Sequence, residues 1–232
     1  MPRPSASVSS RAVPAAVLCT VALLVALVTG GGATSASAHP DAAHHGHARH
    51  ALTARQVAFH DQMRKLWEDH VTWTRLAIVS FADGSDGFPA TAGRLLQNQA
   101  DLGAAIQPFY GPRAGDRLTA LLRDHITIAV DLLRAARGED TTAFGTARAR
   151  WYANADQVAD HLSSLNPGAW PRPVVRAMMR THLDQTLTEA ADELAGDYAG
   201  SVAAYDAIHA HILEMADTLS AGIIDQFPRR FR

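Results

Sequence analysis

Apolar residues recur three and four positions apart along most of the chain after residue 52. The stretch LLRDHITIAVDLL, residues 121–133, shows this spacing, which places the apolar side chains on one face of a helix. No segment alternates between apolar and polar residues over a useful length, so strands are not expected. The pattern predicts an all-α domain over residues 53–232, an antiparallel bundle of about six helices joined by short loops. The other helical segments are 53–81, 91–106, 141–165, 173–196 and 199–226.

Prolines and glycines mark the expected helix ends. The loop DGSDGFP should end the first helix, and Pro108 in the turn PFYGP should stop the second. The third helix should end near Gly138. Pro173 stands at the start of the fifth helix, where a helix tolerates proline.

Two parts of the predicted bundle resemble each other. Asn98 precedes His125 by 27 residues, and Asn154 precedes His182 by 28. Each asparagine is followed, at matching offsets, by two apolar residues. We therefore expect a duplicated helical hairpin, in which the second and third helices resemble the fourth and fifth. The first and sixth helices would flank this pair.

Histidines interrupt the apolar faces of several expected helices. His70, His125 and His182 lie on the apolar stripes of three helices, and His209 and His211 flank the stripe of a fourth. A polar group buried without a partner costs about 1 to 3 kcal/mol. The imidazole nitrogens therefore need hydrogen bonds or a metal ion.

Two interpretations of these histidines stay open. In the first, Asn98 and Asn154 hydrogen-bond to the imidazoles and fix the register of the helices. In the second, the histidines converge from facing helices on a copper or zinc ion. The asparagines, which are poor ligands for such ions, would then orient the imidazoles through their other ring nitrogens. The metal ligands that we predict are His70, His125, His182, His211 and Glu68.

Motifs for other chemistry are missing from the sequence. Di-iron bundles need Glu-x-x-His on two helices, and the chain has none, since HILE at 211–214 has the reversed spacing. Nucleophile elbows, phosphate loops and dinucleotide fingerprints are also missing. Further carboxylates that fall near the histidines in the pattern are Glu189, Glu214 and Asp156.

The first 38 residues have the features of a secretory signal peptide. Arg3 and Arg11 form a positive head, AVLCTVALLVALV is an apolar run too short to cross a bilayer comfortably, and ASA at 36–38 is a cleavage site. An uncleaved N-terminal anchor is the alternative. We expect a secreted or extracytoplasmic protein without a stable membrane anchor after cleavage.

A histidine-rich tail, residues 39–52, would begin the mature chain. It is polar and lacks periodicity, so we expect it to be disordered. Imidazoles on such a tail bind copper, nickel or zinc at neutral pH and release them as they protonate near pH 6. The tail histidines are His39, His44, His45, His47 and His50.

Composition excludes several classes of protein. Cys19, the only cysteine, lies in the predicted signal peptide, so neither disulfides nor thiolate metal sites are expected in the mature domain. Removing Arg3 and Arg11 from the 21 basic residues leaves 19 against 23 acidic residues, a formal charge of −4. This charge argues against a nucleic-acid partner.

Four segments resemble a bacterial family of uncharacterised helical proteins, some of which carry an automatic glycosyltransferase label. The segments are LWEDHVTWTRLAIVS, RLLQNQADLGAAIQPFYG, WYANADQVADHLSSLNP and AYDAIHAHILEMADTLSAGIIDQF, which together run through most of the mature domain. The resemblance implies a helical fold and supplies no site residues. An all-α chain of this size lacks the α/β layers that sugar-nucleotide enzymes normally require, so the sequence does not support the label.

Three functions are therefore compatible with the sequence. The first is an exported, non-catalytic bundle that binds a transition metal through inward histidines. The second is a structural or partner-binding bundle whose histidines form internal hydrogen bonds. The third is an enzyme that uses histidine and glutamate side chains for acid–base catalysis, which would need an open cleft reaching them.

Overall fold

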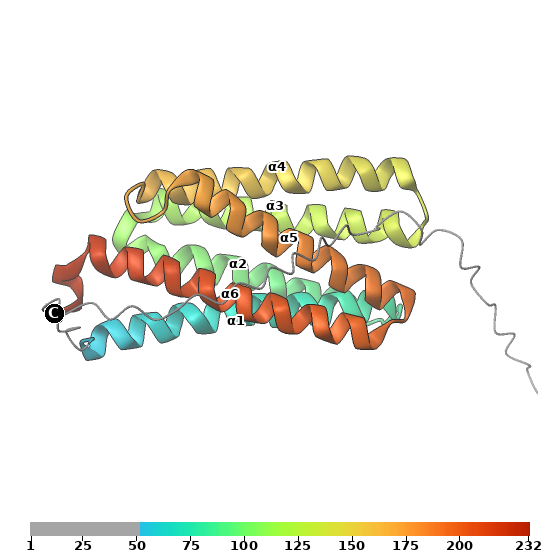
Figure 1. The fold of residues 1–232 in the computed structure, drawn as a ribbon, viewed down its shortest axis with the longest axis horizontal. Coiled ribbons are helices and arrows are strands. Elements are labelled where there is room, and N and C mark those ends of the chain that lie inside the picture. The colour runs from blue at the N-terminus through green and yellow to red at the C-terminus, as the bar shows by residue number, and fades with distance from the viewer. Residues whose placement is uncertain (1–51) are drawn as a thin grey trace, which may run out of the picture. The chain divides into compact units, whose positions relative to one another are not determined.

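The computed structural model describes residues 52–232, and this part of the chain consists of helices with no strand (Figure 1). The predicted all-α fold is confirmed. The predicted signal peptide, and the histidine-rich tail apart from Leu52, lie outside the described residues. The elements are α1 (Ala54–Ala82), α2 (Phe88–Tyr110), α3 (Pro112–Arg137), α4 (Thr141–Leu165), α5 (Arg172–Ala195), α6 (Tyr198–Gln226) and the 3-10 helix η1 (Pro228–Phe231).

Side-chain caps begin three of the helices. At the start of α1, the Thr53 hydroxyl accepts a bond from the Gln56 N–H, and the Gln56 side chain accepts one from the Thr53 N–H. This reciprocal pair satisfies two backbone donors that a helix start leaves free. Asp140 and Asp197 accept single backbone bonds at the starts of α4 and α6. Each cap thus fixes where a helix begins.

The second helix is longer than the sequence pattern indicates. It begins at Phe88 and continues through Pro108 to Tyr110, so the predicted stop at Pro108 is wrong. A proline removes one backbone hydrogen bond, and so near the last turn it disturbs little of the helix that follows. The turn is made instead by Gly111, at φ 84°, which alone separates α2 from α3.

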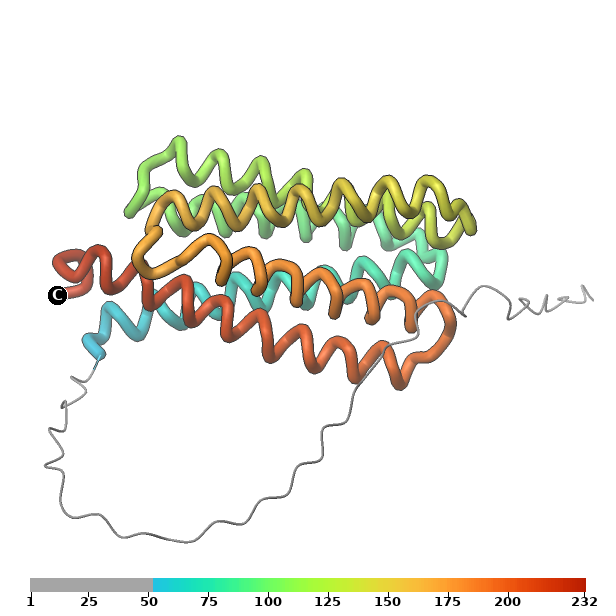
Figure 2. Tube along the Cα trace, turned by 45° about the horizontal axis from the view of Figure 1, so that its top comes forward, coloured from blue at the N-terminus to red at the C-terminus, as the bar shows by residue number. Residues whose placement is uncertain are grey.

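The six helices close into a ring. Each packs against the next along the chain, and α6 packs back against α1. Figures 1 and 2 show the helices side by side along their length, and the colour gradient runs in opposite directions along successive helices. Three consecutive hairpins, α1–α2, α3–α4 and α5–α6, therefore surround one core. None of the helices within residues 52–232 is long and apolar enough to cross a membrane.

Two glycines bring α2 and α3 close together. A Cβ added to Gly103 would lie 2.5 Å from the Gly115 carbonyl oxygen and 2.0 Å from the Thr119 hydroxyl. A Cβ on Gly115 would lie 2.4 Å from the Gly103 carbonyl oxygen. The backbones of the first and second hairpins thus meet where no side chain fits between them.

Replacing Gly103 with alanine should therefore destabilise the bundle. Overpacking of this kind costs about 1 to 3 kcal/mol, which exceeds the gain in helix propensity. Gly145→Ala is the matched control, because Gly145 is exposed in α4 and an added Cβ would meet no atom within 4 Å. The control should raise the free energy of unfolding by about 0.5 to 1 kcal/mol. Urea unfolding measures both changes, and equal stabilisation by the two would contradict the close approach.

Candidate metal centre

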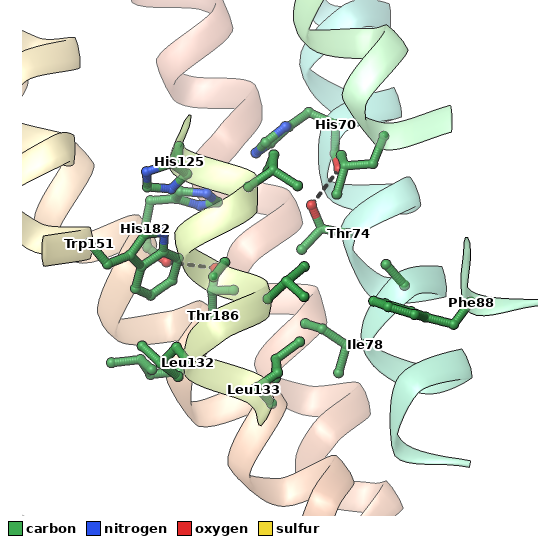
Figure 3. A pocket seen from close by; sticks show the side chains of 17 residues that line it. His70, Thr74, Ile78, Phe88, His125, Leu132, Leu133, Trp151, His182 and Thr186 are labelled. Atoms are coloured by element: carbon green, nitrogen blue, oxygen red, sulfur yellow. Dashed lines mark hydrogen bonds between the residues drawn. The ribbon is translucent and has the colours of Figure 1, made fainter. Parts of the chain in front are cut away.

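Three histidines lie in the core, one on the first helix of each hairpin. His70 is on α1, His125 on α3 and His182 on α5, and their exposed fractions are 3%, 2% and 4%. Figure 3 shows all three around one end of a cavity. The sequence prediction that these imidazoles face the interior is thus confirmed.

One hydrogen bond in each hairpin fixes the turn that carries the histidine. In every case the carbonyl four residues before the histidine accepts a bond from a side chain of the second helix. That carbonyl also accepts the histidine's own N–H in a regular α-helix. The three bonds run from Asn98 Nδ2 to Leu66 O (3.0 Å), from Asn154 Nδ2 to Leu121 O (3.1 Å) and from His211 Nε2 to Met178 O (2.9 Å).

The residues around these bonds repeat as well. The three histidines are 55 and 57 residues apart in the sequence. Each donor side chain is followed by buried apolar residues four and eight positions later. These bonds pair α1 with α2, α3 with α4 and α5 with α6, whereas the expected duplication paired α2 with α3 and α4 with α5. The apolar residues are Leu102 and Ile106, Val158 and Leu162, and Met215 and Leu219.

The imidazole rings are neighbours. The centroids of His70 and His182 are 5.7 Å apart, with the ring planes inclined by 49°. His125 stacks on Trp151 at a centroid distance of 5.0 Å. It is also close enough that its charge would lower the pKa values of both other histidines. The three hairpins therefore place their histidines in one cluster.

The hydrogen bonds of Asn154 define the protonation of His125. Asn154 donates through Nδ2 to the Leu121 carbonyl, which leaves its Oδ1 facing His125 Nδ1 at 2.8 Å. Since a carboxamide oxygen only accepts, Nδ1 carries the proton of the neutral ring. His125 Nε2 then holds a lone pair, and it is buried without a hydrogen-bond partner.

Gln99 contacts His70, and the sequence analysis did not identify it. Its Nε2 lies 2.8 Å from the Leu95 carbonyl oxygen, 3.2 Å from Asn98 Oδ1 and 3.3 Å from His70 Nδ1, and its two hydrogens must serve these three acceptors. Because an amide nitrogen cannot accept, His70 Nδ1 faces it with its lone pair, and the ring proton lies on Nε2. Asn98 thus acts on His70 only through Gln99. The amide next to Asn98 in LLQNQ was the signal available in the sequence.

All three imidazoles are neutral at physiological pH. Burial, with a smaller effect of the nearby His125, lowers the pKa of His70 to about 3, although the Gln99 bond opposes this. Burial lowers the pKa of His125 to about 4, against the effect of the Asn154 bond. Burial and the neighbouring histidines His70, His125 and His211 hold the pKa of His182 well below 6.5. His182 Nδ1 is buried without a partner.

A cavity of about 50 Å³ adjoins the cluster. Figure 3 shows the three histidines at one end, and Leu133, Ile78 and Phe88 toward the other. Its lining is apolar apart from the imidazoles, Trp151 and two threonines.

The other predicted site residues lie outside the cavity lining. Glu68 and His209 form an exposed pair, with Nε2 and Oε1 2.9 Å apart. His211 is held by its bond to the Met178 carbonyl. Asp156 pairs with Arg180 on the surface, and Glu214 is exposed.

Glu189 belongs to a separate buried cluster. Arg75 on α1 lies 2.8 Å from Glu189 and 4.0 Å from Glu193, both on α5. Ser201 on α6 donates to Glu193 at 2.5 Å and accepts from Arg75 at 3.0 Å. Burial raises the pKa of Glu189 to about 7, and the Arg75 guanidinium opposes this rise.

Comparison with known proteins adds no assignment. The chain matches no protein-family model, no curated protein and no solved structure. The resemblance to a family of helical bacterial proteins stays a prediction. Within residues 52–232, no group of three or more His, Cys, Asp or Glu side chains is arranged to hold a metal ion. Binding through the imidazole cluster would require the rings to turn toward a common point.

The buried imidazoles should make the fold sensitive to acid. Because their folded pKa values lie below 6.5, the unfolded chain binds more protons, and stability present above pH 6.5 is lost as the pH falls toward 4. Glu189 has the opposite effect. Because its folded pKa is raised to about 7, the folded chain binds one more proton at this residue than the unfolded chain does between pH 7 and 4.5. Three histidines outweigh one glutamate, so the free energy of unfolding should fall as the pH drops from 6 to 4.5.

Urea unfolding at a series of pH values measures how the free energy of unfolding depends on pH. His182→Gln, which cannot titrate, should make this pH dependence shallower than in the parent. Parallel curves for His182→Gln and the parent would contradict the neutral, buried state of His182.

Proposed function

We propose that this domain binds one transition metal ion, without catalysis, through His70, His125 and His182. The observation that carries the proposal is the convergence of three equivalent imidazoles, one from each hairpin, on one end of the cavity. Two to four histidines that converge from facing helices are how helical bundles build metal sites. Glu68 and His211, which the sequence analysis included, are not part of the proposed ligand set.

The protonation of the cluster supports this proposal. A metal ion binds neutral imidazole and competes with protons for the nitrogen. With pKa values of about 3 and about 4, His70 and His125 are deprotonated throughout the physiological range. His125 Nε2 and His182 Nδ1 also lack protein partners, so an ion would not have to displace a hydrogen bond from either atom.

The ring spacing supports it too. A metal–nitrogen bond is about 2 Å, which places the centres of two imidazoles on one ion roughly 5 to 5.5 Å apart. The centroids of His70 and His182 are 5.7 Å apart, slightly beyond this range. An empty site relaxes outward, and binding would require the rings of His70 and His182 to rotate about their side-chain torsions toward a common ion.

His70 must also change its tautomer. Its Nδ1 now accepts from Gln99, so its proton lies on Nε2, the nitrogen that would have to bind the ion. Gln99 Oε1 is buried without a partner. A rotation of the Gln99 carboxamide would present this oxygen to Nδ1–H and free the Nε2 lone pair, at the cost of the bonds that Gln99 Nε2 donates to Leu95 O and Asn98 Oδ1. Gln99 would then orient His70 as Asn154 orients His125.

The charge of the site favours a monovalent ion. Among the described residues that line the cavity, none carries a carboxylate. The cost of moving an ion into a medium of low dielectric constant rises with the square of its charge. Three neutral imidazoles without a carboxylate therefore suit copper(I) better than zinc(II). If the predicted signal peptide is cleaved, the tail histidines would capture copper outside the cytoplasm and the core would hold it.

Metal binding is tested on the secreted chain, purified without an affinity tag. Replacing the five tail histidines with serine leaves the core as the site under test. Copper(I) should bind this parent at one ion per chain, as measured by competition with a chromophoric chelator. At 100 times its Kd, copper(I) should stabilise the fold by about 2.7 kcal/mol and raise Tm by roughly 5 to 10 °C. Zinc(II) should have a smaller effect.

Variants separate the core cluster from other histidines. His125→Ala combined with His182→Ala should weaken copper binding at least 100-fold. Loss of a group that only orients a metal ligand already lowers metal affinity 10- to 100-fold, and this variant removes two ligands. His209→Ala is the control and should bind like the parent, because His209 pairs with Glu68 away from the cavity. If copper fails to raise the Tm of the parent, or raises it equally in the double variant, the proposal is wrong.

A structural role is the second candidate. The bond between Asn154 and His125, at 2.8 Å, is the kind of internal hydrogen bond that fixes helix register. In that case the double variant would lose stability, while added copper would leave the parent unchanged. An enzymatic role is not proposed, because the cavity is small and no carboxylate among the described residues lines it.

A further inference from the structure

The cavity exists because small residues form the layer one turn beyond the histidines. The residues four positions after His70, His125 and His182 are Thr74, Ala129 and Thr186, and all three line the cavity. Side chains four residues apart lie on the same face of a helix. The three hairpins therefore leave space at equivalent places, directly beside the imidazole cluster.

The threonine hydroxyls do not donate into this space. Thr74 Oγ1 donates to the His70 carbonyl at 2.8 Å, and Thr186 Oγ1 donates to the His182 carbonyl at 2.8 Å. Figure 3 shows both bonds, which run back along each helix. Apart from the imidazoles, the hydroxyl oxygens and Trp151, aliphatic side chains and Phe88 line the cavity. Those that lie away from the imidazoles in Figure 3 include Ile78, Leu132 and Leu133.

The size and polarity of the space limit what it can hold. A volume of about 50 Å³ exceeds the roughly 30 Å³ that a water molecule occupies in the liquid. A buried water needs two to four polar partners, which the aliphatic end of the cavity does not supply. Apolar cavities stay dry and take up small apolar molecules or xenon. An uncharged occupant of two or three heavy atoms is compatible with both the volume and the apolar lining of the cavity.

We propose that this cavity, here called the axial chamber, binds a small apolar gas molecule of the size of dioxygen. The molecule would lie beside the imidazole cluster, with the Thr74, Ala129 and Thr186 layer around it. The binding itself does not require a metal. Only its position next to a bound ion rests on the proposed function.

Xenon tests the chamber in the metal-free protein. Dissolved xenon should shift the methyl NMR signals of Ala129, Ile78 and Leu133 along a saturable curve. Ala129→Val should weaken this response and Ala129→Leu should abolish it, because the added carbons enter the chamber. Ala153→Leu adds the same bulk at an exposed position of α4 and should respond like the parent. A response in Ala129→Leu equal to that of the parent would overturn the proposal.

Dioxygen is then tested directly through its paramagnetism. Under oxygen pressure, the methyl signals of Ile78 and Leu133 should broaden more than those of Ile212, which is fully buried in α6 and does not line the chamber. Ala129→Leu should remove the difference. Uniform broadening of all buried methyl groups in the parent would overturn the proposal. A failure of copper to bind would leave both gas experiments unchanged, so the two proposals fail independently.

Discussion

Side-chain hydrogen bonds to three backbone carbonyls set the geometry on which the core depends. Each carbonyl belongs to the residue four positions before a buried histidine, and each donor comes from the second helix of the same hairpin. A carbonyl has two lone pairs, so it can accept this bond while it also accepts the histidine's own N–H. The bond therefore ties the partner helix to the turn that projects the imidazole. Because the three hairpins use the same register, their imidazoles reach the same layer of the bundle.

This arrangement leaves the core with unsatisfied groups. His125 Nε2 and His182 Nδ1 are buried without partners, at a cost of about 1 to 3 kcal/mol each. These costs are large beside the net stability of a domain, which is about 5 to 15 kcal/mol. Histidines whose only role was structural would be expected to satisfy both ring nitrogens, as buried polar groups usually do. A ligand that binds these nitrogens would offset the cost.

The helices and the inward histidines could be predicted because helical spacing is a local property. The spacing around His125 shows that its ring faces the apolar side before any neighbour is known. The partners of each histidine could not be predicted, because they depend on which helices pack together. Asn98 was expected to act on a histidine directly, whereas it reaches His70 through Gln99. His211 was expected to be a ligand, but a histidine can donate to a carbonyl as an asparagine does, and sequence spacing does not distinguish the two roles.

The places where the three hairpins differ help to decide between the two interpretations of the histidines. Seven residues after the histidine, the first two hairpins have Ala77 and Leu132, but the third has Glu189, buried and paired with Arg75. This ion pair joins α1 of the first hairpin to α5 of the third, and the second hairpin has Leu132 at the position equivalent to Glu189. If the histidines served only to fix helix register, one ion pair like that between Arg75 and Glu189 could fix the register in the layer of the histidines as well. The hairpins instead agree in the layer of the imidazoles, and two of the three rings there keep a nitrogen without a protein partner. That combination favours one shared ligand over three separate hydrogen bonds.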